Sequence, residues 1–148
     1  MHSALLYTPT ASKIILAAKE SGLKGADDLL IDAIIHVLDK SIPDTTLFRL
    51  VPIPSSKASQ RRRGRSFVVD LVSQISQRTG IPMIDCLQLS RRVLDQSGLH
   101  RDERASNLAG AFTLISPARG ELILIDDVVT TGATLREAAR ALNSQGFQ

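Results

Sequence analysis

The stretch LILIDDVVTTGATL, residues 122–135, joins an aliphatic run to two adjacent carboxylates and then to three threonines and a glycine. This order predicts a buried strand, a loop and the start of a helix. Gly132 would allow a tight turn and let a ligand approach the backbone amides closely. Those amides, the threonine hydroxyls and the positive end of the helix suit a phosphate dianion. The run therefore predicts a phosphate-binding loop.

Asp126 and Asp127 need partners of their own, because two carboxylates beside an anion site would repel a bare phosphate. Sugar hydroxyls donate hydrogen bonds, and Mg²⁺ takes oxygen ligands. A ribose 5-phosphate that carries a metal-bound pyrophosphate satisfies all of these groups. The plain alternative is an N-cap Asp and a Thr-Gly turn in an ordinary strand–loop–helix. The complete run, with its strand before and its amphipathic helix after, favours the ligand site.

A basic cluster follows an earlier β-rich segment. Residues 57–65 contain one lysine and four arginines with no acid among them, and such a run attracts phosphates. A solvated surface run is the simpler interpretation on charge alone. Ligands of parallel α/β sheets bind beyond the carboxyl ends of the strands. The basic cluster and the acidic pair both follow such ends, so we expect them on the same side of the molecule.

Strands and helices alternate along the chain. Apolar spacing predicts helices near residues 9–22, 26–40, 68–79 and 135–142, and β-rich segments predict strands at 47–53, 81–89, 110–115 and 121–125. The polar residues 90–107 are expected to form a long loop. The alternation predicts one α/β domain, residues 1–148, with a mostly parallel central sheet and helices on both faces. The uninterrupted aliphatic run at 122–125 is expected to be covered on both faces.

Composition excludes several classes of protein. A chain of 148 residues with 43% hydrophobic residues can bury one sizeable core. Cys86 is the only cysteine, which excludes internal disulfides and a Cys-rich zinc site, and its apolar surroundings indicate a buried thiol. No apolar run approaches the roughly 18 residues of a membrane span, and the first residues lack the pattern of a signal peptide. We expect a cytoplasmic protein without a membrane partner.

The run at 122–135 resembles the phosphoribosyl pyrophosphate (PRPP) motif of type I phosphoribosyltransferases, in which a strand is followed by two acids and a Thr-Thr-Gly-x-Thr loop. The resemblance implies a type I phosphoribosyltransferase-like fold. It also implies that Asp126 and Asp127 contact the ribose hydroxyls, directly or through water bound to Mg²⁺. The 5-phosphate would be held by Thr130, Thr131, Gly132, Ala133 and Thr134.

Two further segments look like the ComF family of competence-associated, phosphoribosyltransferase-like proteins: VPIP with the basic loop that ends in Arg63-Gly64, and QSGLHRDERASNLAGAF at 96–112. Residues 7–19 resemble the first helix of that family. The family commonly carries an amino-terminal Cys-rich zinc module, which this sequence lacks, and we expect a further sheet strand after Gln148. The family's Phe-Asn-Gln is replaced by residues 65–67, and its Thr-Pro-Pro by residues 93–95.

The resemblance implies transfer of a phosphoribosyl group from PRPP to a nitrogen nucleophile, with release of pyrophosphate and with Mg²⁺ as cofactor. Positioning and charge stabilisation would dominate such a reaction. We expect the pyrophosphate to be bound by Ser55, Ser56 and Lys57. The loop 90–104 is expected to be a mobile lid that excludes water. Its candidate residues are Arg92, Gln96 and Arg104, and for each arginine a surface ion pair is the alternative.

A second hypothesis is a PRPP-sensing or nucleic-acid-binding protein without strong catalysis. The basic surface would then contact nucleic acid through Arg61, Arg62, Arg63 and Arg65. The low aromatic content, 3%, argues against a stacking platform for single strands but not against contact with the phosphate backbone. Either hypothesis allows a homodimer and a link to DNA uptake or nucleotide salvage. The sequence does not identify the acceptor.

Overall fold

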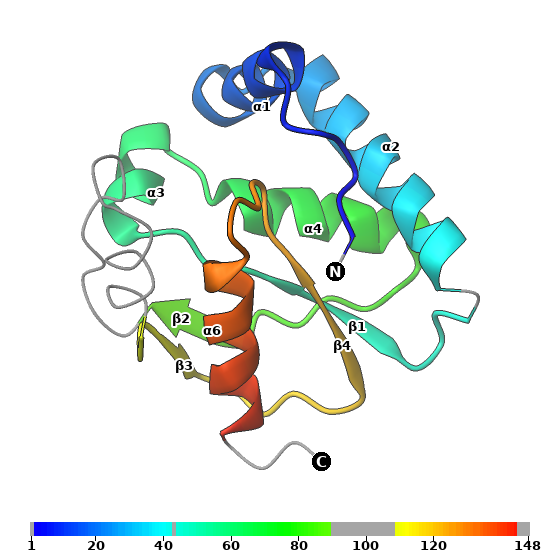
Figure 1. Ribbon diagram of the computed structural model, residues 1–148, viewed down its shortest axis with the longest axis vertical. Helices are drawn as coiled ribbons and strands as arrows, with labels where there is room; N and C mark the ends of the chain where they lie inside the picture. Colours follow the sequence, from blue (N-terminus) through cyan, green and yellow to red (C-terminus); the bar gives the residue numbers. More distant parts are fainter. Residues whose placement is uncertain (1, 43, 90–108, 145–148) are drawn as a thin grey trace.

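The computed structural model describes residues 2–42, 44–89 and 109–144 of the chain. Within these ranges the fold is α/β, with helices gathered around a small parallel sheet (Figure 1). Its elements in chain order are α1 (Pro9–Ser21), α2 (Lys24–Ser41), β1 (Phe48–Pro52), α3 (Lys57–Arg63), α4 (Phe67–Thr79), β2 (Leu87–Leu89), β3 (Phe112–Leu114), β4 (Glu121–Ile125) and α6 (Ala133–Asn143).

Helix α1 begins and ends where the sequence predicts. Thr8 caps its amino end, because Thr8 Oγ1 accepts a hydrogen bond from the Ala11 amide at 3.1 Å, and Pro9 occupies the first helical position. Gly22 ends the helix in the left-handed conformation, with φ at 59°. The predicted helices α2, α4 and α6 are also confirmed, each within a few residues of its expected bounds.

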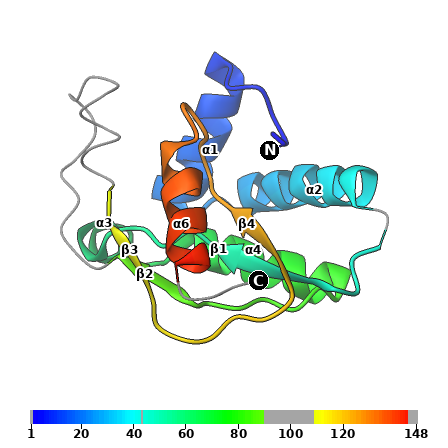
Figure 2. The same ribbon diagram turned by 60° about the horizontal axis from the view of Figure 1, so that its bottom comes forward.

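The central pair of strands is parallel, with a register that runs from Phe48 opposite Glu121 to Pro52 opposite Ile125. Leu50 and Ile125 pack into a core with α1, α2 and α4. Val51 lies on the opposite face, in a second core with α6, β2 and β3. Helices therefore cover both faces of the sheet, as expected, and Figure 2 shows α6 and α4 on opposite sides of it.

The parallel sheet is smaller than the sequence predicts. The described strands form two pairs, β1 with β4 in parallel and β2 with β3 antiparallel. The single strand expected over residues 81–89 is wrong, because only Met83 bridges to Leu50 and the chain joins β3 from Leu87 onward. Pro82 accepts a hydrogen bond from the Leu50 amide but has no N–H to continue the ladder.

The basic segment after β1 is helical rather than a loop. Ser56 caps α3 by accepting the Ser59 amide at 3.2 Å, and Gly64 ends the helix with φ at 68°. The residues between them, among them alanine, glutamine and three arginines, are good helix formers.

The coverage of β4 also differs from the expectation. Leu122, Ile123 and Leu124 are only half-buried, although helices pack on both faces of the strand. A cavity of about 720 Å³ is lined by all four residues 122–125. Successive residues of a strand point to opposite faces, so a cavity that all four line must run along the edge of β4. Among the described strands, only β1 pairs with β4.

Candidate functional site

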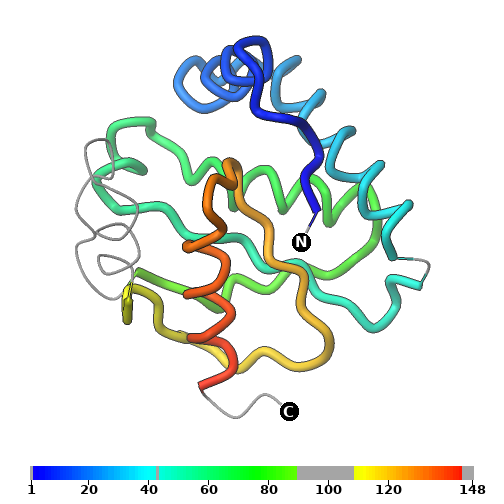
Figure 3. The backbone as a smooth tube through the Cα atoms, viewed as in Figure 1, coloured from blue at the N-terminus to red at the C-terminus, as the bar shows by residue number. Residues whose placement is uncertain are grey.

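The site begins where β1 and β4 end together. The Ile53 amide donates to the carbonyl of Ile125 at 2.9 Å, so the segment after β1 leaves the sheet beside the acidic pair. Residues 126–132 then form the turn that joins β4 to α6. Figure 3 shows this turn rising from the end of β4 toward α1. The prediction that the basic segment and the acidic pair lie on one side of the molecule is confirmed.

The turn has a backbone suited to an anion. Gly132 is buried, has φ at 73° and is the N-cap of α6, so a non-glycine residue would be strained there. Thr131 Oγ1 accepts the Ala133 amide at 3.3 Å, and Arg136 donates to the Thr131 carbonyl at 2.9 Å. The amides of Thr134 and Leu135 belong to the first turn, where no preceding carbonyl of the helix can accept them.

Asp126 lies in an environment that disfavours its charge. Burial and the adjacent charge of Asp127 raise the pKa of Asp126 to about 7. The Asp127 amide donates to Asp126 Oδ1 at 2.9 Å and partly offsets this effect. A carboxylate with such a pKa accepts hydrogen bonds strongly when ionised and gains from any cation or hydroxyl donor that reaches it.

Asp127 has a partner that the sequence reasoning missed. Its Oδ2 forms an ion pair with Nζ of Lys19, in the last turn of α1. The acid pair was expected to need partners from the ligand, and here one comes from the protein. Lysine in a last helical turn is commonly explained by the helix dipole, so its type and position gave no signal of a contact with Asp127.

The candidate pyrophosphate residues lie at the junction of β1 and α3. Ser55 and Ser56 are half-buried and Lys57 is the exposed first residue of α3. The Ser56 hydroxyl is engaged with Ser59, both as acceptor of its amide and as donor to its Oγ at 3.0 Å. The Ser55 carbonyl accepts Gln60 Nε2 at 3.0 Å. These contacts hold the segment at the strand end.

The arginines of the basic cluster separate into two kinds. Arg63 donates to Glu20 of α1 at 2.9 Å, and its side chain is largely buried. Arg65 pairs with the buried Asp27 of α2 at 3.0 Å and lies 5.0 Å from the centroid of the Phe67 ring. Arg61 and Arg62 are exposed, although Nη2 of Arg62 also lies 3.4 Å from Oε1 of Glu20. The cluster is therefore not one free basic patch, because Arg63 joins α3 to α1 and Arg65 joins the segment before α4 to α2.

A metal at this site would be coordinated mainly by a bound small molecule and by water, with few protein side chains. No group of three or more His, Cys, Asp or Glu side chains that could hold a metal occurs in the described ranges. Mg²⁺ commonly keeps several waters and uses one or two carboxylates together with substrate phosphates. The adjacent carboxylates of Asp126 and Asp127 fit that role, and a cation would favour the ionised form of Asp126, whose pKa burial has raised.

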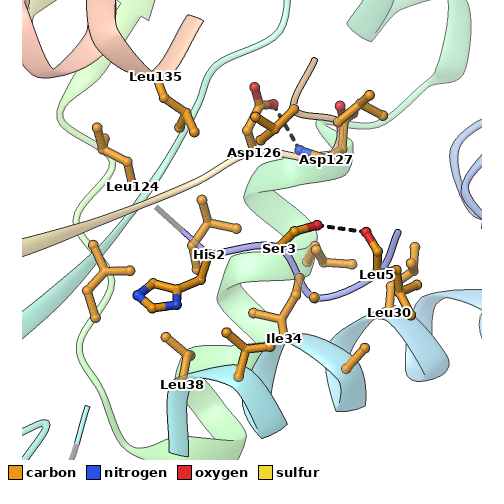
Figure 4. Close-up of a pocket in the computed structure, with 18 of the residues that line it drawn as sticks. His2, Ser3, Leu5, Leu30, Ile34, Leu38, Leu124, Asp126, Asp127 and Leu135 are labelled. Atoms are coloured by element: carbon orange, nitrogen blue, oxygen red, sulfur yellow. Dashed lines mark hydrogen bonds between the residues drawn. The ribbon is translucent and has the colours of Figure 1, made fainter. Parts of the chain in front are cut away.

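The cavity along β4 reaches this site at one end. Figure 4 shows Asp126 and Asp127 at its upper border, with Leu30, Ile34 and Leu38 of α2 along the opposite wall. Most of the remaining lining is aliphatic. Its polar side chains include the acidic pair at this end, and His2, Ser3 and Ser41 elsewhere along the lining.

The candidate lid residues Arg92, Gln96 and Arg104 lie outside the described residues. After these residues in the sequence, Glu137 of α6 accepts the Gly110 amide at 2.7 Å. Glu137 is buried and also accepts Arg140 at 2.7 Å, and this hydrogen bond keeps the pKa of Glu137 below its usual value. Helix α6 thus contacts both the turn at residues 126–132 and the segment that follows the expected lid.

Cys86 is confirmed as a buried structural thiol. Its side chain is fully buried in the core around α6, and burial raises the pKa of the thiol. A nucleophile requires the opposite shift. In the described part of the chain, no helix is long and apolar enough to cross a bilayer.

Comparisons with known proteins were made over the whole chain. No family model matches it. The chain is 31% identical over 105 residues to Competence protein F of Haemophilus influenzae, an alignment that covers 67% of this chain and 45% of that protein. It is 37% identical over 100 residues to Competence protein ComFC of Bacillus subtilis, covering 67% of this chain and 40% of that protein. The chain thus spans less than half the length of these curated relatives.

Proposed function

The chain belongs to the ComF family of competence-associated proteins, and from that premise we propose that it is a PRPP-binding phosphoribosyltransferase. In this proposal the protein transfers a phosphoribosyl group to a nitrogen nucleophile and releases pyrophosphate, with Mg²⁺ as cofactor. Its physiological role is related to competence, as the names of both relatives suggest.

One observation carries the proposal: the strand β4 ends in two carboxylates, and the turn that follows ends in a left-handed glycine at the start of α6. The turn offers backbone amides and threonine hydroxyls to a phosphate. The carboxylates, a few residues before the glycine, offer hydrogen-bond acceptors to the hydroxyl groups of a ligand. A sugar phosphate presents both kinds of group, a phosphate and adjacent hydroxyls, on one small molecule.

The residues would divide the work as follows. Thr130, Thr131, Gly132, Ala133 and Thr134 hold the 5-phosphate, and Asp126 and Asp127 accept the ribose hydroxyls. Mg²⁺ supplies positive charge to the pyrophosphate when it is bound, with the acidic pair reaching it through water. The protein fixes C1 of the sugar relative to the incoming nitrogen, so that positioning supplies much of the rate increase. Negative charge on the acidic pair favours the positive charge that develops on the sugar ring.

The pyrophosphate would lie toward the junction of β1 and α3. Lys57 is exposed there, and the hydrogen bond between Ile53 and Ile125 keeps this junction beside the acidic pair. Ser55 and Ser56 would contribute backbone amides more than hydroxyls, since the Ser56 hydroxyl already caps α3. The segment 90–104 would close over the ligand and exclude water through Arg92, Gln96 and Arg104.

A second candidate is a protein that binds PRPP as a signal and contacts nucleic acid. Exposed Arg61 and Arg62 on α3 favour it, because two adjacent arginines at the surface can follow a phosphate backbone. This candidate uses the same PRPP site, so it differs from the first only in whether pyrophosphate is released.

Pyrophosphate release separates the two candidates. The protein would be incubated with PRPP, Mg²⁺ and a panel of nucleobases and primary amines, and pyrophosphate would be measured in a coupled assay. We expect one member of the panel to raise the rate of release above that of PRPP alone. The matched control is Asp126→Asn with Asp127→Asn, which keeps the side-chain volumes.

Release that is independent of every acceptor, or equal in the double variant, would contradict an enzymatic role for this site. Tight PRPP binding without any release would favour the sensing protein.

A further inference from the structure

The cation that contacts the acidic pair comes from the other end of the chain. Lys19 lies in the last turn of α1, and its Nζ forms an ion pair with Oδ2 of Asp127. Among the described residues, no other lysine or arginine forms an ion pair with Asp126 or Asp127. The contact joins α1 directly to the turn that follows β4.

This ion pair differs from the surface pairs of the molecule. The side chains of Lys19 and Asp127 are 18% and 17% exposed, whereas those of Arg62 and Glu20 are 65% and 37% exposed. Exposed pairs contribute little, because water and salt screen them. A pair that is largely out of solvent is more sensitive to the loss of one partner, since the remaining charge stays desolvated.

Lys19 is held from a second direction by an aromatic ring. Its Nζ lies 5.9 Å from the centroid of the Phe67 ring, within the range of a cation–π contact. Phe67 is buried at the start of α4. The ammonium therefore has a fixed position between a core residue and the acidic pair, unlike a lysine at the free end of a helix.

The carboxylate of Asp127 is consequently oriented before any ligand binds. Oδ2 is taken by the ammonium, and Oδ1 makes no hydrogen bond within the described residues. Two adjacent carboxylates repel each other, and one positive charge at Asp127 lowers the cost of keeping both in one small turn. The geometry thus presents one oxygen of Asp127 as a free acceptor.

We propose that Lys19 is a positioning residue of the sugar-phosphate site: it fixes Asp127 with one oxygen available to a ribose hydroxyl and provides the positive charge of the acidic pair in the metal-free protein. This inference rests on the proposed function and adds a residue to it. Lys19 acts through Asp127 and is not assigned a role in bond breaking.

The proposal predicts that Lys19 and Mg²⁺ compensate for each other. PRPP affinity would be measured by calorimetry in EDTA and in saturating Mg²⁺. Lys19→Met, which keeps the apolar stem against Phe67, should weaken binding about tenfold or more in EDTA, because the acidic pair then lacks its positive charge. The loss should shrink to roughly threefold or less in Mg²⁺. Lys19→Arg should recover most of the affinity in EDTA.

Lys13→Met provides the matched control, since Lys13 is exposed on the same helix and its loss changes the net charge equally. It should bind as the unmodified protein does. Thermal unfolding checks that each variant is folded, and Lys19→Gln replaces Lys19→Met in the comparison if the latter unfolds.

Two results would overturn the inference while leaving the proposed function intact. One is unchanged binding in Lys19→Met under both conditions. The other is an equal loss with and without Mg²⁺, which would mean that Lys19 acts only by supporting the fold. If the unmodified protein binds no PRPP under either condition, the proposed function fails, and the role of Lys19 fails with it.

Discussion

At the scale of single residues, Asp126 is ionised at a cost to the stability of the fold. Its pKa is raised to about 7, first by burial and then by the charge of Asp127. The unfolded chain ionises at the ordinary value of 3.8. Between these two values the folded protein binds more protons at Asp126 than the unfolded chain does, so the contribution of Asp126 to stability is greatest at low pH and is lost as the pH rises through about 7.

We therefore predict that Asp126→Asn stabilises the ligand-free protein at pH 8. The gain should be on the order of 2 kcal/mol larger at pH 8 than at pH 5, because the neutral amide has no charge to desolvate. Urea unfolding at the two pH values measures the difference. A variant that is less stable than the original protein at pH 8 would show that the carboxylate is a structural partner instead.

The residue types of the site could be predicted because they are adjacent in the sequence. Asp126, Asp127 and the Thr-Gly turn form a local pattern whose chemistry is legible without the fold. Lys19 and the pairing of Arg65 with Asp27 could not be predicted in this way. Each depends on the packing of helices from distant parts of the chain, and no local spacing records it.

At the scale of elements, the proposed phosphate site in the turn at residues 126–132 depends on how α6 begins. Gly132, at its N-cap, is in the left-handed conformation and has no side chain that could accept the amides of Thr134 and Leu135, while Thr131 Oγ1 accepts the Ala133 amide. A ligand phosphate would take the place of such a cap by accepting the first amides. The first turn of α6 thus has backbone amides that an anion could bind in place of an N-cap side chain.

We predict that Gly132→Ala and Gly80→Ala differ in binding but not in strain. Both glycines have similar positive φ values, 73° and 77°, so the backbone strain of each substitution should be about 1 kcal/mol. Gly80 ends α4 and has open space around it, away from the acidic pair. Only Gly132→Ala should weaken PRPP binding in calorimetry. Equal PRPP affinity in the two variants would contradict the placement of the 5-phosphate in this turn.

Elements with clear start and stop signals were predicted well. Thr8-Pro9 and Gly22 delimit α1, and the aliphatic run defines β4. The helix α3 was missed because its charge suggested a loop, although Ser56 and Gly64 are ordinary helix boundaries. The prediction of one strand at 81–89 was wrong. Its apolar composition did not reveal that Met83 bridges to β1 whereas Leu87–Leu89 pair with β3.

At the scale of the whole molecule, the parallel register brings the ends of β1 and β4 to one edge, and the α/β class followed from the alternation of elements. The number of strands in the parallel sheet could not be predicted from the sequence, because strand pairing joins residues that are distant in the chain. The same arrangement separates the basic side chains by role. Arg63 and Arg65 join helices, and Arg61 and Arg62 face solvent.

We predict that the two kinds of arginine respond differently to substitution. Arg61→Gln with Arg62→Gln should weaken binding to short DNA and reduce its salt dependence by about one unit of slope per lost phosphate contact. Arg63→Gln should mainly lower thermal stability, since it breaks the pair with Glu20. Fluorescence anisotropy at several salt concentrations tests the first effect. If the double variant binds DNA as tightly as the unmodified protein does, this surface is not the nucleic-acid site.

Calorimetric titration of PRPP in the presence of Mg²⁺ tests the central claim most directly, with Asp126→Asn and Asp127→Asn combined as the comparison. We predict saturable binding to the unmodified protein and a loss of at least about tenfold in the folded double variant, because the ribose hydroxyls lose their charged acceptors. Thr131→Ala should also bind more weakly, whereas Thr113→Ala, at an exposed position of β3, should not. PRPP binding that survives unchanged in both the double variant and Thr131→Ala would contradict the assignment of this loop.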